Sequence, residues 1–171
     1  MNAEPAPLDS PRWLSADENE TWLQFSEIMI RMPSHLDAQL QRDAGLSFYE
    51  YMVLAMLSEQ PDRTLGMGQL AKLTSGSLSR LSHVVKRLEK QGFVTREPSP
   101  HDRRHTNAIL TDTGLAKIVE AAPGHVANVR RLIFDALTST QSEQLREACS
   151  VIKTQIDPSG EGDISTCAPR G

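Results

Sequence analysis

The sequence has only two cysteines among 171 residues, which is too few for the disulfide framework of a small secreted domain. Cys149 falls on the apolar face of an expected helix and is predicted to lie in the core. Cys167 stands in a polar stretch, where a thiol is open to reaction. Neither cysteine has basic neighbours that would favour the reactive thiolate, so a redox switch is the less favoured interpretation.

Long apolar runs are also lacking, and none approaches the roughly 20 residues that a membrane-spanning helix needs. Residues 1–11 are acidic and proline-rich without an apolar core, so they do not resemble a secretion signal. Apolar residues make up 39% of the chain and charged residues 23%, which is typical of a soluble globular protein. We therefore expect one cytoplasmic domain with a substantial core.

Catalytic motifs are missing as well. The sequence contains neither the nucleophile elbow of serine hydrolases nor a glycine-rich phosphate-binding loop. His101, Asp102 and His105 are close enough in sequence to suggest a metal cluster, but at the tip of an expected hairpin they are more often solvated or directed at DNA. We expect no enzyme, no metal and no cofactor.

Positive charge is scarce overall and concentrated in one segment. The formal net charge is −4, yet residues 63–105 hold nine basic and only three acidic residues, or +6. The remaining nine basic and nineteen acidic residues give −10. A basic middle in an acidic frame is typical of a nucleic-acid-binding surface, and the acidic remainder would weaken non-specific binding to phosphate.

Residues 70–92 hold the strongest functional pattern. They are expected to form two short helices around a turn at Ser75 and Gly76, with Gly92 ending the second helix. The second helix has an apolar stripe, and its other side is built of hydroxyls and cations. The stripe consists of Leu78, Leu81, Val84, Val85 and Leu88. The polar side consists of Ser79, His83, Lys86 and Lys90, flanked by Ser82, Arg80 and Arg87.

Acidic residues are nearly absent from this second helix. Glu89 is the only acid between Ser75 and Gly92, whereas an ordinary solvated face mixes both signs. Hydroxyls and cations on one helix face suit the major groove of B-DNA, where they meet bases and phosphates. The segment therefore predicts a DNA-recognition helix.

The preceding chain is expected to be helical. Apolar periodicity predicts a helix from about residue 15 to residue 43, kinked or divided at Pro33, with Gly45 as the left-handed residue after it. Residues 47–50 form a capping box for the next helix, and residues 64–67 a very short strand. Residues 93–97 and 106–110 then predict a β-hairpin. A hairpin directly after a recognition helix is the layout of a winged helix.

The first helix and the last two are longer and more apolar than a small helix-turn-helix core needs. Thr111 is expected to cap a helix that bends at Pro123 and runs to about residue 137, and Thr140 and Glu143 to form the capping box of the last helix. The apolar stripe expected of the first of these helices consists of Leu115, Ile118, Val119, Ala122, Val126, Val129, Leu132, Ile133 and Leu137. Packing of these helices on a second copy would place two recognition helices roughly 34 Å apart on a pseudo-palindrome. A larger monomeric core is the alternative.

From Trp13 to Ile156 the chain resembles the multiple-antibiotic-resistance regulator (MarR) family of bacterial winged-helix transcription factors. The resemblance rests on a set of short motifs in the family's order and spacing. These motifs are Leu70-Ala71, Arg87-Leu88-Glu89, Gly92-Phe93-Val94, Asp102-Arg103-Arg104, and Leu110-Thr111 followed by Gly114. Residues 74–77 depart from the pattern, since many members have an apolar residue, a glycine and a charged residue there.

The resemblance implies a mainly α fold with a small β-hairpin, that is, a winged helix-turn-helix with long N- and C-terminal dimerisation helices. A flexible N-terminal arm, one MarR-type domain and a disordered tail are expected. Their ranges are 1–14, 15–156 and 157–171, and within the domain 46–114 form the DNA-binding lobe and 15–45 and 115–156 the dimerisation helices.

The resemblance also implies how DNA is bound. The recognition helix of a homodimer enters the major groove, and the wing lies in or beside the minor groove, where Asp102 orients Arg104. The DNA-binding candidates are Ser77, Ser79, Arg80, Ser82, His83, Lys86, Arg87, Lys90, Asp102, Arg103 and Arg104. Repression is the implied mode. The alternative is a winged-helix protein-interaction module without operator binding, which would not need these cations.

Many members bind an aromatic or phenolic effector between the dimerisation helices and the winged domain. In this chain His35, Tyr49 and Met52 are the candidates to line such a crevice. Ordinary packing or surface roles are the alternative for each of them.

Overall fold

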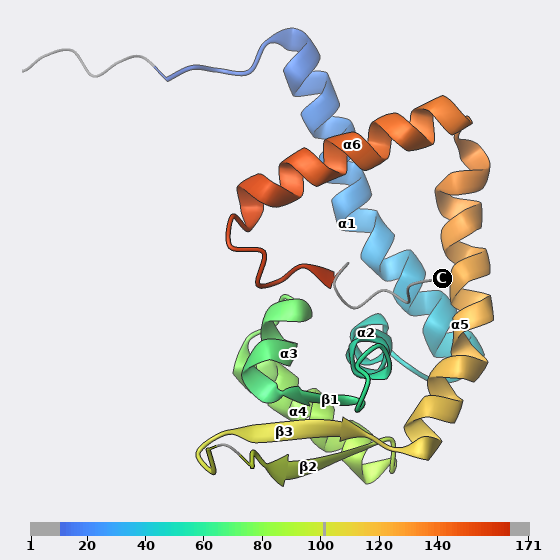
Figure 1. Ribbon diagram of the computed structural model, residues 1–171. Coiled ribbons are helices and arrows are strands. Elements are labelled where there is room, and N and C mark those ends of the chain that lie inside the picture. The colour runs from blue at the N-terminus through green and yellow to red at the C-terminus, as the bar shows by residue number, and fades with distance from the viewer. Residues whose placement is uncertain (1–10, 101, 165–171) are drawn as a thin grey trace, which may run out of the picture. The chain divides into compact units, whose positions relative to one another are not determined.

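The computed structural model describes residues 11–100 and 102–164, in two compact units, residues 1–34 and 35–171. Helices dominate, and three short strands form one sheet, so the predicted fold class is confirmed. In chain order (Figure 1) the elements are α1 (Ala16–Ala44), α2 (Phe48–Ser58), β1 (Thr64–Gly66), α3 (Met67–Leu73), α4 (Leu78–Lys90), β2 (Val94–Pro98), β3 (Thr106–Leu110), α5 (Asp112–Leu132), the 3₁₀ turn η1 (Phe134–Ala136) and α6 (Ser139–Ile156).

The first unit contains the N-terminal part of α1. Ser15 caps this helix, since its Oγ accepts from the Glu18 backbone N–H at 3.2 Å and Glu18 Oε2 accepts from the Ser15 N–H at 2.7 Å. The helix is continuous through Pro33, so the predicted division does not occur. Within this unit Trp22, Leu23 and Ile30 are exposed, leaving a wide apolar surface uncovered.

The second unit holds the hydrophobic core. Its antiparallel sheet has the order β1-β3-β2, with Leu65 opposite Ala108 and Val94 opposite Leu110. The short strand predicted at residues 64–67 therefore pairs with the hairpin. Helices α2, α3 and α4 lie beside the sheet (Figure 1). Their buried apolar side chains, mostly leucines and valines, complete the core.

The apolar stripe of α4 is buried except at its start. Leu81, Val85 and Leu88 are fully buried and Val84 packs against the core. Leu78 is 54% exposed, so its predicted burial is wrong. It is the first residue of the helix and lies beyond the edge of the core.

The face of α5 that packs into the core differs from the predicted stripe. Ile118 is buried as predicted, but Val119 and Val126 of the same predicted stripe are exposed, and Ala121 and Asn128, outside that stripe, are buried. The helix has apolar residues on two sides. The side with Ile118 and Ala121 packs against the core, and Val119 and Val126 on the other side remain mostly exposed.

The connection from α5 to α6 differs from the predicted one. Helix α5 ends at Leu132 rather than near residue 137, and the turn η1 follows. The capping box of α6 uses Thr138 and Gln141 instead of Thr140 and Glu143. Both pairs have the required spacing; the earlier pair acts because the chain is already extended at Leu137, directly before Thr138.

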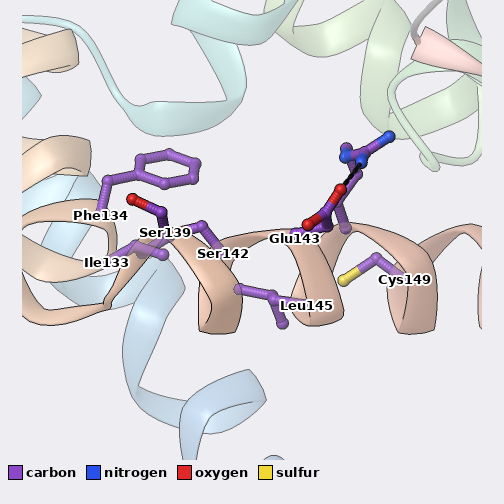
Figure 2. A pocket seen from close by; sticks show the side chains of 8 residues that line it. Ile133, Phe134, Ser139, Ser142, Glu143, Leu145 and Cys149 are labelled. Atoms are coloured by element: carbon purple, nitrogen blue, oxygen red, sulfur yellow. Dashed lines mark hydrogen bonds and ion pairs between the residues drawn. The ribbon is translucent and has the colours of Figure 1, made fainter.

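Cys149 is exposed, so its predicted place in the core is wrong. It lies on α6 beside Leu145, at a pocket of about 720 Å³ next to Ile133 and Phe134 (Figure 2). Helix α6 has the predicted apolar side, but no other described part of the chain covers it. Cys167 lies outside the described residues.

His125 of α5 is half-buried against aromatic rings of α2. Its ring centroid lies 4.3 Å from that of Tyr51 and 6.0 Å from that of Phe48, and its Nδ1 has no hydrogen-bond partner among the described residues. Burial lowers the pKa of His125 from the ordinary value of 6.5, because the charged imidazolium loses its hydration.

Acid is therefore expected to destabilise the chain through His125. The unfolded chain takes up a proton near pH 6.5 and the folded chain only at lower pH, so the free energy of unfolding is fully retained above about pH 7 and falls toward pH 5. Denaturant midpoints of the wild type and His125→Gln at both pH values measure this, and the variant should show the smaller change. The same substitution at the exposed His83 is the control, and an equal effect there would contradict the assignment.

Candidate nucleic-acid interface

The turn between α3 and α4 sets the start of the recognition helix. Ser75 adopts a left-handed φ of 49°, and Gly76 follows it. Ser77 then caps α4, since its Oγ accepts from the Arg80 backbone N–H at 3.2 Å. The predicted turn and helix are both present, and Gly92, with φ of 77°, lies just after the helix end.

Four predicted DNA-binding side chains form the outer face of α4. These are Ser79, His83, Lys86 and Lys90. All four are exposed and form no hydrogen bond or ion pair with any residue that the structure describes. Their donors are therefore available to an external ligand.

Two arginines on one flank of α4 contact the start of α2. The Arg80 guanidinium carbon lies 4.3 Å from the Tyr49 ring centroid. Arg87 Nε donates to Glu50 Oε1 at 2.5 Å, and Glu50 is only 2% exposed. Arg87 is more than half exposed, yet it anchors α4 to α2, so its predicted contact with DNA would be additional to a structural role.

The wing presents one oriented arginine. Arg104 Nε lies 3.1 Å from both carboxylate oxygens of Asp102, and an Arg104 terminal nitrogen lies 2.7 Å from Oδ2. The Arg104 side chain and backbone N–H hold the pKa of Asp102 below its ordinary value, so the carboxylate stays charged. The side chain of Arg104 remains 87% exposed. The structure thus has the pairing expected of a wing arginine.

A hollow of about 520 Å³ connects the wing to the recognition helix. Its lining includes Leu78 and Ser82 of α4, Arg96 of β2, and Arg104 and His105 of the wing. The Ser82 hydroxyl donates to the Leu78 carbonyl at 2.8 Å. Two predicted DNA-binding residues from distant parts of the sequence, Ser82 and Arg104, therefore border one concave surface.

Some basic residues of the segment 63–105 form ion pairs with acidic residues, and others do not. Arg63 pairs with Asp112, Arg96 with Glu89, and Lys72 with Glu161 of the segment after α6. By contrast Arg80, Lys86, Lys90 and Arg103 have no acidic partner within residues 11–100 and 102–164. The unneutralised positive charge therefore lies on α4 and the wing.

Comparison with known proteins decides the family. A family model described as MarR family matches residues 44–105. The HTH-type transcriptional regulator MhqR of Bacillus subtilis is 32% identical over 123 residues, which are 71% of this chain and 79% of MhqR. The structure of Sco3205, a MarR family regulator of Streptomyces coelicolor in complex with DNA, is similar with a TM-score of 0.83 and 46% identity, over 91% of this chain and 97% of Sco3205.

This chain belongs to the MarR family. It is a DNA-binding transcriptional regulator and not an enzyme. A more distant member, the transcriptional repressor MprA of Escherichia coli, is 21% identical over 164 residues, 92% of this chain and 93% of MprA.

In this MarR-family regulator the three effector candidates have different surroundings. His35 is exposed on α1, and Met52 is partly buried against the core. The Tyr49 hydroxyl lies 2.9 Å from Thr74 Oγ1, at the turn before the recognition helix. Sequence reasoning missed the link between α2 and α4, because Tyr49 and Glu50 contact partners 31 and 37 positions further along the chain.

The remaining expectations concern metals and membranes. His101 of the suggested metal cluster lies outside the described residues, and Asp102 is engaged by Arg104. No helix within residues 11–100 and 102–164 combines the length and apolarity that crossing a bilayer requires.

Proposed function

We propose that this regulator is a repressor that binds a pseudo-palindromic operator as a homodimer. The observation that carries the proposal is the outer face of α4, where Ser79, His83, Lys86 and Lys90 have no partner among the described residues, together with an oriented Arg104 that borders the same hollow as Ser82 of α4. Helix α4 would read base edges in the major groove and Arg104 the minor groove. Arg103 and the hollow beside Ser82 would meet phosphates. Repression is the mode that the name of MprA supports.

The homodimer is supported by apolar surface that the chain leaves uncovered. Trp22, Ile28 and Ile30 are exposed in the first unit, and Val151 and Ile156 of α6 in the second. Large exposed apolar surface, here present on each unit by itself, is typical of interfaces in soluble proteins. We assign residues 46–114 to DNA binding and residues 15–45 and 115–156 to dimerisation. Sedimentation measurements of the purified protein test this assignment, and a monomer at micromolar concentration would refute it.

Release by a small aromatic or phenolic effector is part of the proposal. Gln39 Oε1, His125 Nδ1 and Asn128 Nδ2 are buried without a hydrogen-bond partner among the described residues. Gln39 belongs to α1 and the other two to α5, and of the three His125 lies against the rings of Phe48 and Tyr51 of α2. Buried polar atoms beside aromatic rings are typical of small-molecule sites. Operator release by a panel of phenolic acids, lost in His125→Phe, is the test.

The regulator function is tested by recovering bound genomic DNA and measuring affinity for the recovered sites at several salt concentrations. His83→Ala is expected to change base preference while retaining the salt dependence. Lys86→Ala, the matched control on the same face, is expected to weaken all sites evenly and reduce the log–log salt slope by about one. A salt-independent affinity would favour the alternative of a protein-interaction module.

A further inference from the structure

Tyr49 of α2 contacts both the turn before the recognition helix and the helix itself. Its hydroxyl lies 2.9 Å from Thr74 Oγ1, and Thr74 Oγ1 lies 2.8 Å from the Leu70 carbonyl oxygen. The single threonine proton is engaged by that carbonyl, so the tyrosine O–H donates to Thr74. This bond fixes the orientation of the phenol ring.

Gly76 makes room for the phenol. A Cβ on residue 76 would lie 2.0 Å from the Tyr49 hydroxyl oxygen and 2.9 Å from the ring carbon that bears it. A larger residue at this position would therefore displace the ring. The turn at residues 74–77, which departs from the common family pattern, is thus shaped around Tyr49.

The fixed ring supports Arg80. The guanidinium carbon lies 4.3 Å from the ring centroid, and Arg80 has no acidic partner among the described residues. A cation–π contact uses the face of the guanidinium, so its N–H donors, which lie in the guanidinium plane, remain unused. Arg87, seven residues later on the same flank, differs because its Nε donates to Glu50.

We propose that Tyr49 is a specificity-determining residue that positions Arg80 to read a base in the major groove. An arginine whose N–H edge is free and whose plane is fixed is suited to a bidentate contact with guanine. Without the ring, Arg80 still carries its charge but loses its preferred orientation. This inference rests on the proposed DNA-binding mode, and it gives Tyr49 a role different from effector binding.

The test is a double-mutant cycle in the full-length protein on the recovered operator and on every single-base-pair variant of one half-site. Tyr49→Leu is expected to weaken operator binding by about three- to tenfold and to flatten base preference at the same base pairs as Arg80→Ala. In the Arg80→Ala background it should cost nothing further. Tyr49→Phe keeps the ring but loses the hydroxyl bond to Thr74, so its loss of affinity should be smaller than that of Tyr49→Leu.

Lys90 provides the matched control, since it is a cation on the same helix without a ring contact. Losses from Tyr49→Leu and Lys90→Ala should multiply independently. Should Tyr49→Leu fail to fold by thermal melting, Tyr49→Met replaces it. Additive losses for Tyr49 and Arg80, or an even weakening of all operator variants by the tyrosine substitution, would overturn the proposal.

The proposed DNA-binding function and the proposed role of Tyr49 would be contradicted by different results. If the wild type binds no duplex with a steep salt dependence, the proposed function itself is wrong. A second outcome is that the wild type binds DNA and Arg104→Ala weakens this binding, while Arg80→Ala changes neither affinity nor base preference. In that case DNA binding is retained as the function and the proposed role of Tyr49 is wrong.

Discussion

Gly114→Ala is expected to lower the free energy of unfolding by about 3 kcal/mol, because the added methyl group would overpack a rigid junction. A Cβ on residue 114 would lie 2.1 Å from the Phe93 carbonyl oxygen and 2.7 Å from Leu110 Cδ1. That carbonyl accepts the Thr111 backbone N–H at 3.1 Å, and the Thr111 hydroxyl donates to the Gly92 carbonyl at 2.6 Å. The clash therefore falls on backbone that is held by two hydrogen bonds.

Chemical unfolding of the wild type and the variant measures this loss. Gly68→Ala is the matched control, since Gly68 is helical and nothing lies within 4 Å of its would-be Cβ. Alanine there is expected to leave stability equal or raise it by up to about 1 kcal/mol. An unchanged midpoint for Gly114→Ala would show that the entry to α5 can relax away from β2.

Arg104→Ala is expected to weaken operator binding by about 10- to 100-fold at fixed salt, while the oligomeric state stays unchanged. The side chain is exposed and held by Asp102 in a bidentate arrangement, so a groove contact would need little reordering. Asp102→Ala should cause a smaller loss at the same operator positions, because the guanidinium remains but is no longer oriented.

Fluorescence anisotropy with labelled operator measures both effects. Arg130→Ala is the control, as Arg130 is an exposed arginine on the last turn of α5 and likewise pairs with an aspartate, Asp135. Its affinity should match that of the wild type. Unchanged affinity for Arg104→Ala would remove the wing from the binding mechanism.

Most of the elements could be predicted because their signals are local. The capping box at Ser47 and Glu50, the left-handed Gly45 and the stripe of α4 each depend on residues within about one or two helical turns. One wrong prediction, the capping box of α6, is local as well. At Thr138 and Thr140 two capping patterns overlap, and only the extended chain at Leu137 selects between them.

The face of α5 could not be predicted from the sequence. Val119 and Val126 are as apolar as Ile118, so periodicity alone does not choose which side is buried. The choice depends on the shape of α2 and the core, against which Ala121 and His125 pack. The same reasoning applies to Cys149, which lies on an apolar helix side that no other described residues bury.

The sequence by itself determined the helix-turn-helix, the hairpin, the basic segment and the motifs of the MarR family, because periodicity, capping and charge are properties of neighbouring residues. Only the tertiary structure decided which cations remain unpaired. Arg87 is joined to Glu50 and Arg80 lies on Tyr49, whereas Lys86 and Lys90 are left for a ligand. These contacts join residues more than 30 positions apart, and no local pattern records which side chains the folded core brings together.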